Sequence, residues 1–167
     1  MEPVIILISI IITLVFSAFF SGMEIAFISA NRLKIALDDK QGGVKAKILA
    51  YFAKKPAAFI GTMLLGNNAA IVAYSMFMAM AIDDPLTDLI GMAWLVLLIQ
   101  TIITTILVLI FAEFLPKAIF HINPNRALSM LAFPLAIIYG ILWLPTFLII
   151  GLAELILKIF IREKGDN

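Results

Sequence analysis

The chain has 167 residues, of which 63% are hydrophobic and 14% are charged, and its formal net charge is +1. Soluble domains are about 45–50% apolar and about 25% charged, so this composition excludes a soluble globular domain, a disordered chain and a nucleic-acid binder. There is no cysteine, which excludes disulfides, thiolate metal sites and thiol catalysis. We expect an all-α membrane protein with three transmembrane helices plus juxtamembrane or re-entrant helices at the cytoplasmic side.

Charge-poor apolar runs locate the expected transmembrane helices. A helix needs about 20 apolar residues to cross the bilayer core, and runs of that length predict spans over residues 3–30, 56–82 and 89–116. The first run is not a secretory signal, because it lacks a basic start and is longer than the usual stretch of about 7–15 apolar residues. The N-terminal run is therefore expected to stay in the membrane.

Lysine and arginine predict the orientation of these spans. Residues 31–55 carry seven of these basic residues, whereas residues 83–88 carry none and hold three aspartates. Basic loops stay on the cytoplasmic side, so we expect a multi-pass protein of the cell membrane with its N-terminus outside and its C-terminus in the cytoplasm. Gly42-Gly43 divides the basic stretch into two short amphipathic helices at the inner surface.

Residues 127–157 form an apolar stretch of a different kind. Basic residues on both sides place both ends in the cytoplasm, the run is too short for two crossings, and Pro134 and Pro145 are expected to break or kink a helix. We expect a re-entrant hairpin or a belt of helices in the inner leaflet, with a fourth span as the alternative. One membrane domain, 1–162, then comprises the three spans and juxtamembrane helices at about 31–55 and 126–162, followed by a tail at 163–167.

Hydroxyl residues recur at every fourth position of the first span: Ser9, Thr13, Ser17 and Ser21. This spacing places them along one helical face. For Ser9 and Thr13 we favour helix packing, because small and hydroxyl residues let membrane helices approach closely. Ser21 differs, since Gly22 and Glu24 lie beside it. A carboxylate within a span is expensive and usually marks an ion or proton path.

The second span carries Gly66, Asn67 and Asn68 near its middle. Neighbouring residues point about 100° apart around a helix, so the two amides cannot both serve one packing face. Glycine also weakens the helix locally. We expect a local break whose freed carbonyls line a cavity or an ion; a pair of interhelical hydrogen bonds is the alternative.

The third span ends in a carboxylate followed by a proline. Pro116 clashes with the carbonyl of residue 112 and removes one helical hydrogen bond, so an unpaired carbonyl is expected near Glu113. Glu113 and Lys117 are four residues apart, and a simple salt bridge at the inner interface is the alternative.

Together the three spans offer only hard oxygen ligands. Carboxylate, amide and hydroxyl oxygens suit Mg²⁺, Ca²⁺ or Na⁺ and disfavour Zn²⁺ and Cu⁺. The lone histidine, His121, lies outside the expected spans. We expect one Mg²⁺ to bind among the spans, with most of its ligands from protein.

Three short motifs carry a family resemblance. They are residues 20–26 (FSGMEIA), 66–68 (GNN) and 112–117 (AEFLPK). In order, in spacing and in the basic loop after the first motif, they resemble the transmembrane domain of the CNNM/CorC (cyclin-M-like) magnesium transporter family. The resemblance implies three spans, an outside N-terminus, a homodimer in membrane lipid, and export of Mg²⁺ in exchange for Na⁺. It also implies an ion site at or near Ser21, Gly22, Glu24, Gly66, Asn67 and Glu113.

Members of that family usually continue into paired CBS domains that bind ATP with Mg²⁺. This chain ends at Gly165-Asp166-Asn167, so we expect the membrane part alone, which ATP would reach only through such following domains. There are two rival functions. A Mg²⁺-sensing membrane scaffold would bind the ion without moving it. An enzyme is not expected, because Glu24 and Glu113 would lack a nucleophile and a substrate pocket.

Overall fold

The computed structural model describes residues 2–163, except for the side chains of residues 154, 157 and 159–163. Every regular element in this part of the chain is helical and no strand occurs there, so the expected all-α class is confirmed. In chain order the elements are α1 (Pro3–Ser29), α2 (Arg32–Gln41), α3 (Val44–Lys54), α4 (Pro56–Ile90), α5 (Ala93–Val108), the π-helical η1 (Leu109–Phe114), α6 (Leu115–Ile122), α7 (Pro124–Met130) and α8 (Ala132–Glu163).

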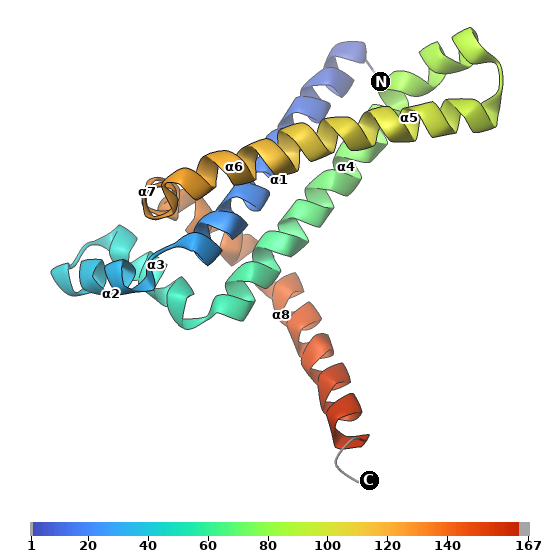
Figure 1. The fold of residues 1–167 in the computed structure, drawn as a ribbon. Coiled ribbons are helices and arrows are strands. Elements are labelled where there is room, and N and C mark those ends of the chain that lie inside the picture. Colours follow the sequence, from blue (N-terminus) through green and yellow to red (C-terminus); the bar gives the residue numbers. More distant parts are fainter. Residues whose placement is uncertain (1, 164–167) are drawn as a thin grey trace.

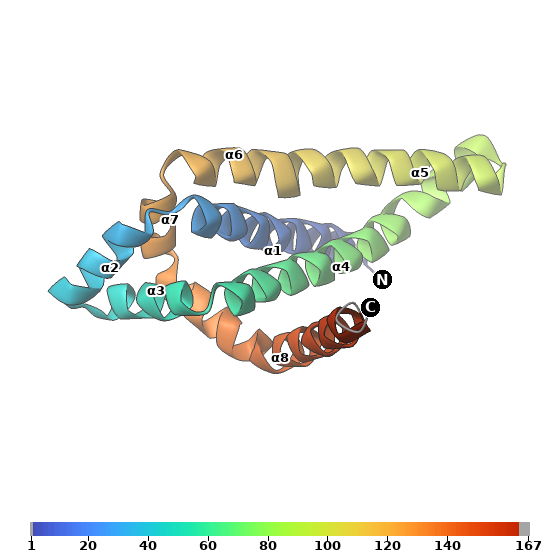
Figure 2. The same ribbon diagram turned by 60° about the horizontal axis from the view of Figure 1, so that its bottom comes forward.

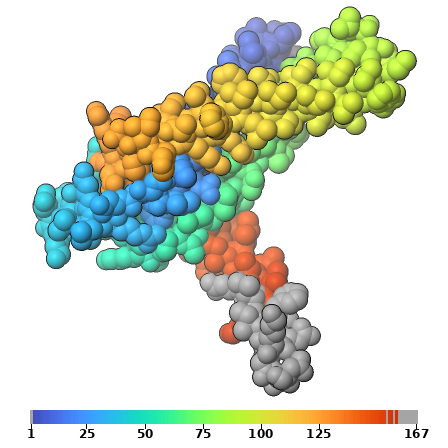
Figure 3. Space-filling view, in the orientation of Figure 1, coloured from blue at the N-terminus to red at the C-terminus, as the bar shows by residue number. Residues whose placement is uncertain are grey.

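Four helical segments of the described chain are long and apolar enough to cross a membrane: α1, α4, the continuous run from α5 through η1 to α6, and Ala132–Ala153 of α8. Large apolar side chains stay exposed along them, among them Leu7, Val72, Leu97 and Leu148. Such surfaces suit contact with lipid rather than water. α1, α4 and the α5–α6 run lie side by side, whereas α8 projects away from them (Figures 1–3).

The expected external loop is helical. Residues 83–88 continue α4 as far as Ile90 in spite of Pro85, and Gly91 then ends the helix in the left-handed conformation with φ of 69°, a common C-terminal cap. α5 consequently begins at Ala93 instead of residue 89. The apolar pattern indicates which part of a helix lies in lipid. The helix α4 itself continues beyond its apolar part, as far as Ile90.

The basic stretch forms two helices as expected, with Gly42 and Gly43 at positive φ between them. The Asn31 side chain caps α2 by accepting a hydrogen bond from the Lys34 N–H. Asn125 of α7 makes two hydrogen bonds with the Asn31 backbone: its Oδ1 accepts from the N–H at 3.0 Å and its Nδ2 donates to the carbonyl at 3.3 Å. α2, α3 and α7 thus form one layer at a shared end of the long helices (Figure 2).

An aromatic cluster fastens this layer to the long helices. The rings of Phe27 (α1) and Phe59 (α4) stack with centroids 4.1 Å apart, and Phe52 of α3 lies 5.1 Å from Phe59. Tyr139 of α8 lies 4.9 Å from Phe52. Such pairs contribute about 0.5–1.5 kcal/mol each beyond burial, so the first turns of α8 are held against α3 while its later part projects.

Residues 132–157 form one continuous helix, α8, where a re-entrant hairpin or a belt of short helices was expected. Pro134 falls in the first turn, where the missing N–H would have no helical partner anyway. Only Pro145 interrupts the hydrogen-bond ladder, and one such interruption kinks a membrane helix without ending it. Sequence reasoning gave the two prolines equal weight, although their positions in the helix differ.

Candidate cation site

The first and second long helices are joined by a buried polar contact. Ser17 of α1 donates a hydrogen bond from Oγ to Asn67 Oδ1 of α4 at 2.6 Å. Ser17 is fully buried and Asn67 is 7% exposed. Interhelical bonds of this kind hold membrane helices together, so Asn67 has the packing role that the sequence left open for it. An amide oxygen has two lone pairs, and this bond uses one.

Ser21 lies one helical turn further along the same face of α1. It is fully buried, and its Oγ has no hydrogen-bond partner. Buried polar groups nearly always have a partner, because an unpaired one keeps its desolvation penalty. A hydroxyl in this state is a free hard oxygen donor, as the expected ligand set requires.

Glycines allow very close helix contacts on both sides of these residues. A Cβ placed on Gly66 would collide with the Phe20 ring, and one on Gly22 would lie 2.8 Å from Phe120 of α6. Gly22 and Gly66 therefore leave room for the rings. Their positions explain their residue type without any ligand role.

The expected break in α4 is wrong, because helix continues through Gly66, Asn67 and Asn68. The Phe20 ring packs against the helical backbone at Gly66. Asn68 is exposed. The structure therefore brings Asn67, but not Asn68, to the contact with α1.

The carboxylate of the third span lies in a π-helical turn. η1 covers Leu109–Phe114, and the Leu115 N–H bonds to the Ile110 carbonyl five residues earlier. Single π-turns occur frequently at functional sites. The sequence predicted a disturbed backbone here from Pro116, and the disturbance takes this form. Glu113 is half-buried, between the buried Ala112 and Pro116.

α1 packs against both η1 and α6, so the helix that carries Ser21 touches the segment that carries Glu113. Glu24, one turn beyond Ser21, is half-buried, as is Lys117. Among the side chains that the structure describes, no ion pair within 4.0 Å is formed, so Lys117 does not hold the Glu113 carboxylate by the expected alternative bridge.

No cluster of three or more His, Asp or Glu side chains occurs in the described part of the chain. His121 instead pairs with Ser29, with Nδ1 and Oγ 2.9 Å apart. A cation would therefore bind mainly to neutral oxygens and one or two carboxylates. Sequence reasoning did not include Ser17 in this site, although its position in the four-residue repeat between Thr13 and Ser21 pointed to it.

Long lipid-compatible helices with buried polar contacts between them define a multi-pass α-helical membrane protein. The family model described as "Cyclin M transmembrane N-terminal domain" matches residues 7–167. The chain belongs to this family, as its three motifs indicated.

Curated relatives are longer than this chain. The UPF0053 inner membrane protein YfjD of Escherichia coli K12 is 32% identical over 149 residues, which cover 89% of this chain and 32% of the relative. A UPF0053 protein of Haemophilus influenzae is 28% identical over 159 residues, which cover 92% of this chain and 36% of the relative. The chain thus spans about one third of the length of the curated relatives it matches.

Proposed function

We propose that this chain is the membrane domain of a Mg²⁺ transporter that moves Mg²⁺ out of the cell in exchange for Na⁺. One observation carries the proposal: the buried Ser21 hydroxyl has no partner, and it lies one turn from the Ser17–Asn67 bond on a helix that also packs against η1. Membership of the cyclin M family supports it.

The donor set suits Mg²⁺ as a transported ion. Mg²⁺ takes oxygen ligands in octahedral geometry at about 2.0–2.1 Å and gives up its water reluctantly. Ser21 Oγ, the second lone pair of Asn67 Oδ1 and the Glu113 carboxylate are hard donors from three helices. Only one of these three donors is charged, so Mg²⁺ would bind weakly enough to be released, as transport requires.

The π-turn gives Glu113 a direction that a regular helix would not. Adding one residue to a turn rotates the following side chains by about 100°. η1 therefore decides whether Glu113 faces α1 or lipid. We propose that this turn aims the carboxylate at the ion, and that Glu24 lies at the cytoplasmic edge of the same path.

The proposal includes the rest of the assembly. We place the N-terminus outside and the C-terminus in the cytoplasm, which requires that α8 does not cross the bilayer although Ala132–Ala153 is long and apolar enough to do so. Two copies form a dimer within membrane lipid. The chain is not an enzyme and binds no nucleic acid. ATP would act only through domains that follow the membrane domain in longer proteins.

A flux assay in liposomes tests this function. The purified chain is reconstituted around a Mg²⁺-sensitive dye, and Mg²⁺ entry is followed with Na⁺ inside and K⁺ outside. We expect entry that accelerates with the outward Na⁺ gradient and stops when K⁺ replaces Na⁺ on both sides. Saturable Mg²⁺ binding without flux would contradict transport and favour a sensing scaffold. Absence of both binding and flux would contradict any role with this ion.

A further inference from the structure

A hollow of about 310 Å³ lies between the start of α4 and the middle of α8. Lys55, Ala58 and Thr62 line it on one side, and residues between Tyr139 and Gly151 of α8 line it on the other. Because α8 projects away from α4 beyond this contact (Figure 1), the hollow has the form of a wedge between two diverging helices. Its volume is at the lower end of the range of about 300–1,000 Å³ typical of small-molecule sites.

The end of the wedge at the start of α4 is polar. Lys55 Nζ donates a hydrogen bond to Tyr51 Oη at 3.3 Å, but among the side chains described by the structure it has no carboxylate within 4.0 Å. Tyr139 lies beside Tyr51, with ring centroids 6.2 Å apart. No side chain caps the 35-residue helix α4. N–H groups of its first turn, such as that of Ala58, therefore lack a helical acceptor, and the helix dipole favours an anion there.

Thr146 adds an unused hydroxyl to the wall formed by α8. It is 4% exposed, and its Oγ1 has no partner in the described part of the chain, whereas Thr62 Oγ1 donates to the Ala58 carbonyl at 2.8 Å. A Cβ built on Gly61 would lie 3.7 Å from Thr146 Cγ2, so Thr146 is level with Gly61, about 9 Å along α4 from Lys55. A buried hydroxyl without a partner keeps its desolvation penalty until a ligand pairs with it.

The end of the wedge beyond Thr146 is apolar, and Phe147, Ile150 and Gly151 line it. The wedge therefore offers, in order, a cation with helix N–H groups, a hydroxyl and an apolar surface. A phospholipid has the matching groups in the same order: a phosphate, ester carbonyls and acyl chains.

We propose that the wedge between α4 and α8 binds one anionic phospholipid of the cytoplasmic leaflet. The phosphate contacts Lys55 Nζ and the Ala58 N–H, an ester carbonyl accepts from Thr146 Oγ1, and an acyl chain lies on Phe147 and Ile150. The cytoplasmic leaflet is rich in anionic lipids and attracts basic segments. No lining residue of the wedge belongs to α1 or η1, so this lipid site is separate from the proposed ion site.

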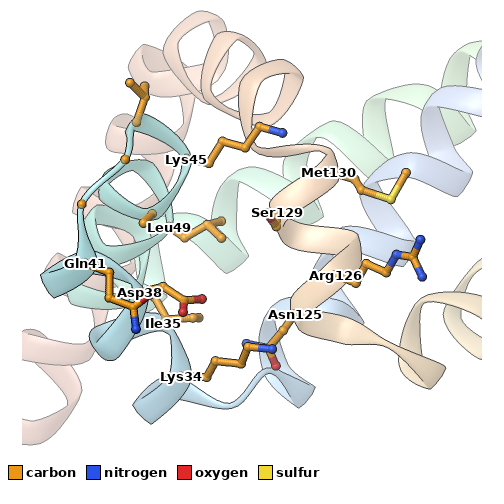
Figure 4. A pocket seen from close by; sticks show the side chains of 14 residues that line it. Lys34, Ile35, Asp38, Gln41, Lys45, Leu49, Asn125, Arg126, Ser129 and Met130 are labelled. Atoms are coloured by element: carbon orange, nitrogen blue, oxygen red, sulfur yellow. The ribbon is translucent and has the colours of Figure 1, made fainter.

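A larger hollow of about 670 Å³ lies between α2, α3 and α7 (Figure 4). Its lysines, Lys34 and Lys45, lie at opposite ends of α7. Three buried side-chain oxygens of the described residues lack a partner, and none of them lines this hollow. The wedge differs because it combines a cation with a buried, unpaired hydroxyl.

A second copy of the chain is the competing occupant of the wedge. Trp143 and Phe147 also line the wedge, yet 53% and 62% of their surfaces are exposed. A lipid would cover the side of these rings that faces α4 and leave the other side free for contact with a second copy. Lipid binding and the dimer fraction therefore need to be measured in the same variants.

Two matched pairs of variants test the two ends of the wedge. Lys55→Gln removes the cation of the polar end, and Lys54→Gln removes the neighbouring exposed lysine, which does not line the wedge. Gly151→Phe fills the apolar end, whereas Gly140→Phe adds the same ring to α8 outside the wedge. A Cβ on either glycine meets nothing within 4 Å, so both should fold, which circular dichroism checks. Thr146→Val removes the hydroxyl and keeps the shape.

Native mass spectrometry of the whole purified chain in detergent counts bound lipid during titration with phosphatidylglycerol or phosphatidylcholine. We expect one phosphatidylglycerol per chain, bound at least about tenfold more tightly than phosphatidylcholine, whose choline cation is repelled by Lys55. Lys55→Gln should weaken binding at least about tenfold and Thr146→Val about two- to tenfold, as expected for one charged and one neutral hydrogen bond. Gly151→Phe should weaken it at least about tenfold, because its ring takes the place of the acyl chain. Lys54→Gln and Gly140→Phe should bind like the wild type.

Several results would overturn the proposal. Equal losses in Lys55→Gln and Lys54→Gln would show that binding follows surface charge. Equal affinity of the wild type for the two lipids, or wild-type affinity in Gly151→Phe or Thr146→Val, would show that the lipid does not lie in the wedge. If Gly151→Phe lowers the dimer fraction and leaves phosphatidylglycerol binding unchanged, a second copy fills the wedge instead.

Discussion

At the scale of single residues, the side chains of the proposed ion site differ in how many of their hydrogen bonds are made within the fold. Ser17 and Asn67 are bonded to each other, so part of their hydrogen-bonding capacity is used within the fold. Ser21 is buried without a partner. Glu113 is half-buried in a span and has no ion pair among the described residues. Three buried hydroxyls of the described residues lack a partner, those of Ser21, Thr104 and Thr146. Of these, only Ser21 is expected to meet the ion.

Glu113→Gln should abolish Mg²⁺ flux while leaving the protein folded. Glutamine keeps the volume and one acceptor oxygen but removes the charge that balances the cation. A charged contact contributes about 1.5–3 kcal/mol, so the initial rate in liposomes should fall at least about tenfold. Glu24→Gln should have a milder effect, because we place Glu24 at the edge of the path.

Lys117→Gln is the matched control for this change. If Glu113 served only as its salt-bridge partner, both variants would lose the same small amount, under about 1 kcal/mol for an exposed pair. We expect near-normal flux in Lys117→Gln. Normal flux in Glu113→Gln, with the protein monodisperse and helical, would refute the ligand role.

Gly66→Ala should destabilise the chain, because the added methyl group would collide with the Phe20 ring. Overpacking of this kind costs about 1–3 kcal/mol. Gly140→Ala in α8 is the control, since a Cβ there meets nothing within 4 Å and alanine favours helix. Thermal unfolding in detergent should give a lower midpoint for Gly66→Ala only. Equal midpoints would mean that α1 and α4 are not packed as described.

Residue types favour ion-binding chemistry, which stays a prediction, and they are a poorer guide to geometry. The motifs around Ser21 and Asn67 indicate hard oxygen donors, and the structure joins α1 to α4 through Ser17 and Asn67, one helical turn from Ser21. The roles of Gly22 and Gly66 were not predictable from sequence, because they depend on rings that arrive from other helices. The sequence does not identify Ser17 as a site residue, because a repeat of hydroxyl residues is equally consistent with helix packing.

At the scale of elements, proline position explains most differences between the expected and observed helices. Pro134 falls in the first turn of α8 and has little effect, whereas Pro116 comes two residues after Phe114, the last residue of the π-helical η1. Apolar patterns located the three expected spans, whereas the stretch that forms α8 was expected to be broken. The ends of α4 and α5 depend on caps such as Gly91 beyond the apolar run. A π-turn has no sequence signature beyond the proline that follows it.

Pro116→Ala should reduce flux by disturbing η1. Alanine restores the backbone N–H and removes the ring, so a regular α-helix can form in place of the π-turn. Without the extra residue of the π-turn, Glu113 would be rotated by about 100° around the helix axis. Pro145→Ala is the control, because it also removes a proline within a long helix but lies in α8. We expect a loss of flux in the first variant and nearly none in the second. Similar rates in both would show that η1 does not orient Glu113.

At the scale of the whole molecule, α8 leaves a large apolar and aromatic surface uncovered beyond its first turns. Trp143 and Phe147 stack with centroids 5.8 Å apart and are 53% and 62% exposed. Pro145 leaves the Ile141 carbonyl without its helical N–H donor, and a free carbonyl is costly in lipid. Tyr139 packs within its own chain instead, while Phe133 is exposed and the Phe160 side chain lies outside the described residues.

A two-fold dimer with α8 in its interface should follow from this exposed surface. Single cysteines in place of Trp143 or Phe147 should form covalent dimers in native membranes, and the chain has no cysteine to interfere. Leu135→Cys is the control, because Leu135 is fully buried within its own chain and should not cross-link. If no exposed position between 140 and 150 cross-links while positions on other helices do, α8 faces lipid alone.

The most direct measurement is an experimental structure of the chain with Mn²⁺ in place of Mg²⁺, since both are hard ions that take octahedral oxygen sites. The anomalous signal of Mn²⁺ locates the ion independently of the protein. We expect one peak in contact with Ser21 Oγ, Asn67 Oδ1 and the Glu113 carboxylate, with most ligands from protein, and its loss in Glu113→Gln. A peak elsewhere, or a saturated protein with no ion between these three residues, would contradict the account.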